Sequence, residues 1–99
     1  MKIISQRNCA PSAEHASHDV YLFGVDTAGS ARPFYFEQSI GGGHAERGGA
    51  AYLNLAGLAN WPGDWRLHLE KAGCGWVADV LAHAASDAQA VTAILARAR

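Results

Sequence analysis

Residues 76–97 read WVADVLAHAASDAQAVTAILAR, and their apolar side chains recur with the period of an α-helix. At about 100° per residue, the apolar positions fall in one stripe about 100° wide that continues to residue 98. A helix with such a stripe needs an apolar layer to cover it, so this segment predicts an amphipathic helix packed on a sheet. The stripe consists of Val77, Val80, Leu81, Ala84, Ala88, Val91, Leu95 and Ala98.

The same segment also contains a signal for a break. Ser86-Asp87-Ala88-Gln89 has the spacing of a capping box, which would start a second helix. One continuous helix from about Trp76 to Arg97 is the favoured interpretation, because the stripe does not jump at Ser86. Two helices that meet near Ser86 are the alternative.

The chain before residue 76 alternates between short apolar runs and turn clusters about ten residues apart, which is typical of an antiparallel meander. VYLFGV at Val20–Val25 is apolar on both faces, so this strand is expected at the centre of the sheet. The expected strands are Lys2–Gln6, Val20–Val25, Phe34–Ile40, Ala50–Ala56 and Trp65–Glu70.

Two of these segments need comment. Trp65–Glu70 (WRLHLE) alternates most regularly, with apolar side chains on one side and polar side chains on the other, and predicts a half-buried strand. Ala50–Ala56 fits either a strand or a helix, and a strand is favoured because paired glycines precede it and Gly57 follows it. The predicted fold is therefore α+β: one domain over residues 1–99, with an antiparallel sheet of four or five strands and the C-terminal helix on one face.

Composition excludes several classes of protein. The chain is 49% hydrophobic and 17% charged, which is too apolar for a disordered protein. Its net charge is -1 and like charges do not form runs, so nucleic acid is an improbable partner. No apolar stretch approaches the ~20 residues of a membrane span, and no signal peptide is recognisable, so no membrane association and a cytoplasmic location are expected.

The sequence predicts neither a metal nor a cofactor. His15 and His18, with Cys9 before them, are the best metal candidates, but no further ligand pair completes a zinc set. Cys9 and Cys74 are expected to be thiols. The glycine-rich segment Gly41–Gly49, with His44 and Arg47, has backbone amides and a cation that could bind phosphate. It lacks the spacing of known nucleotide loops, so a small-molecule or nucleotide sensor is an alternative function.

A minimal enzyme using Cys74, His68 or His83 is a further alternative. Asp79, His83 and Asp87 are spaced so that a carboxylate could orient the imidazole on a helix. The sequence contains no nucleophile elbow of the Gly-x-Ser-x-Gly type. We therefore expect that the protein is not an enzyme.

The favoured function is a small protein-interaction module. It would bind a larger protein or complex and block or modulate it, for example as a stoichiometric phage-type inhibitor of a bacterial defence complex. Heptad spacing along the C-terminal helix (Val77, Ala84, Val91) would also allow a homodimer. The residues expected to bind the partner lie in polar or turn segments and are His44, Arg47, Trp61, Arg66, His68 and Glu70.

Overall fold

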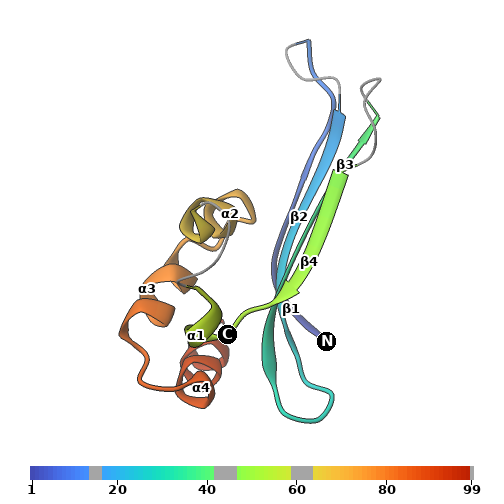
Figure 1. Ribbon diagram of the computed structural model, residues 1–99. Helices are drawn as coiled ribbons and strands as arrows, with labels where there is room; N and C mark the ends of the chain where they lie inside the picture. Colours follow the sequence, from blue (N-terminus) through green and yellow to red (C-terminus); the bar gives the residue numbers. More distant parts are fainter. Residues whose placement is uncertain (14–16, 42–46, 59–63, 99) are drawn as a thin grey trace.

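The computed structural model describes residues 1–13, 17–41, 47–58 and 64–98, with no side-chain description for residues 47–51. It has two layers: an antiparallel sheet and a set of helices that cover one of its faces (Figure 1). The α+β class, the antiparallel sheet and the C-terminal helical region are confirmed. The sheet runs in the order β1-β2-β3-β4, and its strands are β1 (Lys2–Cys9), β2 (Ser17–Asp26), β3 (Arg32–Gly41) and β4 (Arg47–Tyr52).

Strands β2 and β3 form the longest hairpin, paired from Ser17↔Gly41 to Asp26↔Arg32. The turn between them contains Gly29 at φ +73°, a conformation that favours glycine. One carboxylate oxygen of Asp26 accepts a hydrogen bond from the Ala28 amide at 3.0 Å, which fixes the start of this turn. The hairpin supplies the two central strands of the sheet.

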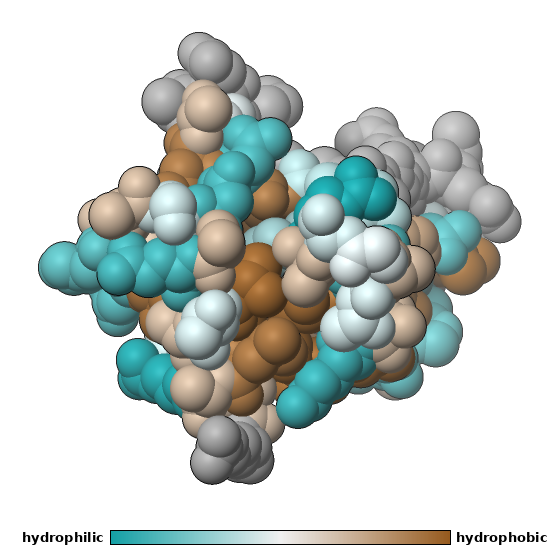
Figure 2. Space-filling view, turned by 90° about the horizontal axis from the view of Figure 1, so that it is seen from below, coloured by the Kyte–Doolittle hydropathy of each residue, from teal (hydrophilic) through white to brown (hydrophobic). Residues whose placement is uncertain are grey.

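The helical layer consists of α1 (Leu55–Leu58), α2 (Trp65–Lys71), α3 (Trp76–His83) and α4 (Asp87–Arg97). We call the sheet face that it covers the inner face and the opposite one the outer face. On the inner face, Phe23, Val25 and Tyr35 are buried against the helices. Seen from below, apolar side chains gather at the centre of the molecule (Figure 2). The helices contribute Leu69, Val77, Leu81, Val91 and Ile94 to this core.

The prediction that Trp65–Glu70 is a strand is wrong, because this segment forms α2. The Asp64 side chain caps the helix by accepting a hydrogen bond from the Arg66 amide at 2.9 Å. Gly73, at φ +85°, follows the helix and permits a close approach to β1. The expected sheet of four or five strands is therefore not confirmed, because Trp65–Glu70, which was counted among those strands, is a helix.

The expected continuous C-terminal helix is also wrong, and the alternative break is what the structure has. Ala84 is extended between α3 and α4. The Ser86 hydroxyl accepts a hydrogen bond from the Gln89 amide at 3.1 Å, and the Gln89 side chain accepts one from the Ala85 amide at 2.5 Å. These two bonds satisfy backbone amides that would otherwise lack partners at the start of α4.

The break also changes which residues of α4 face the core. Ile94 is fully buried, whereas Ala88 of the predicted stripe is exposed. The expected strand at Ala50–Ala56 divides as well: β4 ends at Tyr52 and α1 begins at Leu55. Between them, the Leu53 amide donates a hydrogen bond to the Pro33 carbonyl oxygen at 2.8 Å. The chain thus leaves the sheet edge and enters the helical layer within three residues.

Candidate interaction surface

The outer face of the sheet is uncovered by any helix of the described chain (Figure 1). The strand register places its residues in three central rows across the strands. None of these positions carries a charged side chain. The rows are Ile3–Gly24–Phe34–Tyr52, Gln6–Leu22–Phe36–Ala50 and Asn8–Val20–Gln38–Gly48.

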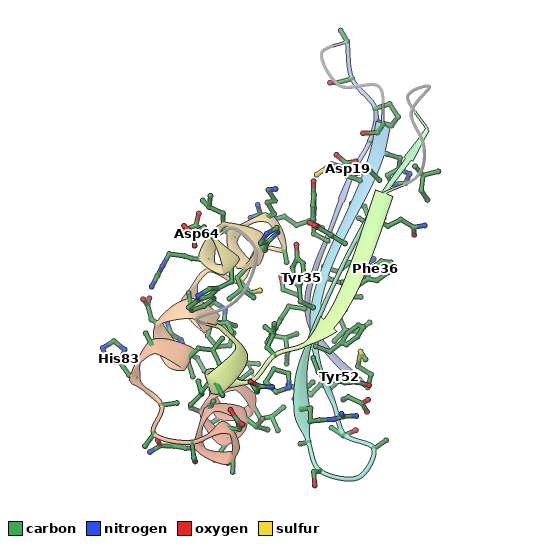
Figure 3. The ribbon with its side chains drawn as sticks, in the orientation of Figure 1. Asp19, Tyr35, Phe36, Tyr52, Asp64 and His83 are labelled. Atoms are coloured by element: carbon green, nitrogen blue, oxygen red, sulfur yellow. The ribbon has the colours of Figure 1, made fainter. Side chains whose placement is uncertain are left out.

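The side chains on this face form an apolar patch. Ile3 is 55% exposed and Tyr52 is 43% exposed, while Leu22, Phe34 and Phe36 are half-buried among their neighbours. The Phe34 and Tyr52 rings meet edge to face with their centroids 5.3 Å apart. Figure 3 shows Tyr35 on the helical side of β3 and the adjacent Phe36 on the opposite side. Contiguous apolar patches of this kind mark interaction sites on soluble proteins.

Charge appears at the lower end of the outer face, where β2 turns into β3. The Tyr52 hydroxyl donates a hydrogen bond to Asp26 at 2.6 Å, and the Arg32 guanidinium lies 3.7 Å from the centre of the Tyr52 ring. The hydrogen bond from Tyr52 lowers the pKa of Asp26, and the same bond raises the pKa of Tyr52. Asp26 and Arg32 therefore lie side by side at the edge of the uncharged patch, and the N-terminal ammonium also helps to lower the pKa of Asp26.

Gly24 lets the N-terminus lie against this face. A β-carbon at Gly24 would come within 2.8 Å of the Lys2 carbonyl oxygen and within 3.3 Å of the Met1 sulfur. The glycine thus permits β1 to pair closely with β2, and Met1 adds to the apolar patch next to Phe34, which shares the row of Gly24.

The inner face ends in a polar cluster where α2 lies over the upper part of the sheet. We define the cluster by five residues. The Tyr35 hydroxyl donates a hydrogen bond to Glu37 at 3.1 Å, and Nδ1 of His68 lies 3.5 Å from the same carboxylate oxygen. Asp19 is buried and accepts a hydrogen bond from Ser17 at 2.9 Å, with the Tyr21 hydroxyl at 3.5 Å. The polar cluster comprises Asp19, Tyr21, Tyr35, Glu37 and His68.

The electrostatics of this cluster keep its phenols neutral. Burial, and then the charge of Glu37, raise the pKa of Tyr35 well above its ordinary value. Burial, followed by the charge of Asp19, raises the pKa of Tyr21. Both phenols donate to carboxylates of their own strands, and the cluster contacts α2 through His68, whose ring also packs edge to face against Tyr35.

The structure does not assemble the partner-binding surface predicted from sequence. Arg66, His68 and Glu70 lie on α2 instead of on one strand face. The Arg66 guanidinium pairs with Asp79 at 3.2 Å, His68 turns inward to Glu37, and Glu70 is exposed. His44 and Trp61 lie outside the described residues. Arg47 begins β4, and its side chain lies outside the description as well.

The residues proposed for a minimal enzyme are likewise not brought into one site. Cys74 is buried, its thiol donates a hydrogen bond to the Leu69 carbonyl oxygen at 3.4 Å, and burial raises its pKa to about 11. His83 is exposed and contacts the backbone oxygen of Asp79 in its own helix at 2.8 Å. The Asp87 carboxylate accepts a hydrogen bond from the Leu55 amide at 2.8 Å. The predicted helical Asp–His–Asp arrangement therefore does not form.

The structure gives little support for the other sites expected from the sequence. Within the described ranges, no group of three or more His, Cys, Asp or Glu residues could hold a metal ion, and His15 lies outside those ranges. A groove of about 470 Å³ lies between residues 30–32 and the first turns of α4, but its charged groups, Arg32 and Asp87, are engaged with Tyr52 and Leu55. The Gly41–Gly49 segment divides between the end of β3, undescribed residues and the start of β4.

The heptad positions expected for a homodimer are used inside the molecule. Val77, Leu81 and Val91 are buried in the core between the helices and the sheet. The break at Ala84 also interrupts the seam. The fold therefore does not present these positions as the seam of one continuous helix.

Comparison with known proteins gives no further guide. No protein-family model, no curated protein and no solved structure matches this chain. Among the described helices, none has the length and apolar character needed to cross a membrane.

Sequence reasoning missed the outer face, although the signal was present. The two-sided apolar pattern of Val20–Val25 predicted a central strand, and β2 lies at the centre of the sheet. The helices cover only the inner side of this strand, so no described helix covers the outer half of the pattern.

Proposed function

We propose that the protein is an interaction module that binds another polypeptide through the outer face of its sheet. One observation carries the proposal: the same strands are covered by helices on one side, while no described helix covers the three uncharged rows on their other side, which include an apolar patch. Burying such a patch against a second protein would remove from water the exposed Ile3 and Tyr52 and the remaining exposed surface of the half-buried Leu and Phe side chains.

The proposal includes the blocking role expected from the sequence. A module of about 10.5 kDa that binds by a preformed flat face would act by occupying a surface of its target, one copy for each site. Such stoichiometric inhibition, as in phage inhibitors of bacterial defence complexes, requires binding alone. The buried Cys74 thiol is uncharged and donates a hydrogen bond to a backbone carbonyl. This state fits a protein that acts by binding better than one that uses a nucleophilic thiol.

A matched pair of variants tests the surface. Leu22→Glu places a charge at the centre of the outer face, and Leu67→Glu places the same charge on α2, where Leu67 is 54% exposed. Wild type and both variants would serve as bait for affinity capture from lysates, with melting temperatures recorded as the control for folding. We expect a protein that is captured by wild type and Leu67→Glu and is lost with Leu22→Glu. Equal capture by all three baits would contradict the proposal.

A further inference from the structure

We infer that, in the free protein, a second copy of this chain covers the outer face and forms a two-fold symmetric dimer. The inference rests on the proposed function, because it names the polypeptide that occupies the proposed surface. Its first support is charge. The three central rows are uncharged, so nothing in them repels an identical face.

The order of the strands makes the face complementary to itself. A two-fold axis parallel to the strands and between β2 and β3 places β2 of one copy over β3 of the other. Residues paired within one sheet then face each other across the two sheets. Leu22 lies over Phe36 of the second copy, and the Met1–Gly24 patch lies over Phe34 of the second copy.

The same operation also pairs the charges at the lower end. Asp26 and Arg32 are register partners within one copy. The two-fold axis therefore brings Asp26 of each copy toward Arg32 of the other. This charged row thus contributes opposite charges at both symmetric contacts, and the three adjacent rows of the two copies face each other along the same axis.

The area is sufficient for a specific contact. Strands β1 to β4 at about 4.8 Å spacing span about 19 Å, and about eight residues along each strand span about 27 Å. The face thus projects to roughly 500 Å² on each copy, or roughly 1,000 Å² in the pair, which reaches the lower bound for a specific protein interface. Side chains that project from the sheet increase the buried area above this projected value.

Self-association through the β1 edge is disfavoured by the fold. The β1 edge carries an irregularity between Ile3 and Ser5, together with the charged residues Lys2 and Arg7, and both features discourage strand addition at an edge. Most of the helical stripe is used by the core, where Val77, Leu81 and Val91 are buried. The outer face carries apolar side chains that no described helix covers.

Sedimentation velocity on the full chain tests the inference over about 1 µM to about 500 µM. We expect wild type to shift from 10.5 kDa to twice that mass, with a dissociation constant below about 100 µM. Leu22→Glu should weaken the dimer at least about 30-fold, because it buries an unpaired charge against an apolar ring. Leu67→Glu should stay within about twofold of wild type.

A gentler variant guards against misfolding. Gln38→Glu is nearly isosteric, and its side chain shares the outer row with Val20. We expect about tenfold weaker dimerisation with an unchanged melting temperature at low protein concentration. A dimer that persists in both Leu22→Glu and Gln38→Glu would overturn the inference.

A charge exchange tests the orientation of the two copies. Asp26→Arg and Arg32→Asp should each weaken self-association, because like charges then meet at both symmetric contacts of the dimer. Mixing the two variants should restore association about threefold or more relative to either alone, since each contact again joins opposite charges. Absence of any gain in the mixture would overturn the proposed two-fold axis.

The outcomes separate this inference from the proposed function. A wild-type chain that stays monomeric at 10.5 kDa, yet captures a different protein in a manner that Leu22→Glu abolishes, overturns the dimer and leaves the interaction module standing. A monomer whose capture is insensitive to Leu22→Glu overturns both. A dimer disrupted by Leu67→Glu in place of Leu22→Glu assigns the interface to the helical layer and overturns the inference.

Discussion

The two faces of the sheet are built from alternate residues of the same strands, yet helices cover only one of them. Tyr35 is 3% exposed beneath the helices, whereas its neighbour Phe36 is only half-buried on the outer side. Both faces are rich in aromatic and branched side chains. The difference lies in the covering layer, because the chain contains enough apolar helix for one face and none for the other among its described elements. An apolar strand pattern therefore indicates burial without saying which molecule provides the cover.

The largest expected effect compares Phe23 with Phe36. Phe23 is fully buried, so Phe23→Ala should lower the free energy of unfolding by about 3–5 kcal/mol. Phe36→Ala should cost less, about 1–2 kcal/mol in the monomer, because the ring is only half-buried and no described helix covers it. Urea unfolding at low micromolar concentration measures both values. Equal losses would show that the two faces are equally covered in the isolated chain.

Alkaline pH should act through the inner face. Burial raises the pKa of Cys74 from 9.0 to about 11, and burial raises the pKa of Tyr35. The unfolded chain releases these protons at a lower pH than the folded chain does, so stability is intact below about pH 9 and falls as the pH approaches 11. The thiol alone contributes about 2–3 kcal/mol of this loss.

Urea midpoints at several pH values between 8 and 11 would record that loss. Cys74→Ala should reduce it, whereas Cys9→Ala should leave it unchanged, because Cys9 is exposed. A pH dependence that is identical in both variants would show that the Cys74 thiol does not titrate as its burial requires.

A smaller effect is expected from the cap that positions α4 over the inner face. Ser86→Ala removes the acceptor of the Gln89 amide and should destabilise the protein by about 1 kcal/mol. Ser86→Asp keeps an acceptor and should restore most of the loss. Thermal unfolding of the three proteins provides the comparison. Unchanged stability in Ser86→Ala would indicate that the covering helix does not depend on this cap.

The smallest effect belongs to the solvent side of the helical layer. Arg66 and Asp79 form an ion pair at 3.2 Å with both side chains well exposed. Asp79→Asn should change the free energy of unfolding by less than about 1 kcal/mol, and salt should reduce that difference further. Urea unfolding with and without added salt measures it. A loss in the free energy of unfolding above about 2 kcal/mol would contradict the solvent exposure of the Arg66 and Asp79 side chains.

Much of the fold follows from sequence periodicity, and the errors have physical causes. Val20–Val25 and Phe34–Ile40 lie within β2 and β3, because short runs of aromatic and branched residues with turn signals on both sides specify a strand. Trp65–Glu70 alternates equally well, but the Asp64 side chain caps a helix there, and so short a segment fits either period. The uninterrupted apolar stripe suggested one C-terminal helix, while the local hydrogen bonds of Ser86 and Gln89 decided for two.

The candidate surface was harder to predict than the fold. The partner-binding residues chosen from sequence were polar residues near turns, and Arg66 and His68 instead pair with Asp79 and Glu37 within the chain. The outer face depends on the register of separate strands and on the absence of a second helical layer among the described elements. Neither property is visible in the composition of one segment.

The contact between Gly24 and the first two residues has a practical consequence for handling the protein. Met1 and Lys2 lie at the margin of the outer face, whereas the C-terminus belongs to α4 in the helical layer (Figure 1). An affinity tag fused ahead of Met1 would hang beside the surface whose binding is to be measured. A purification handle placed after Arg99 leaves that surface clear.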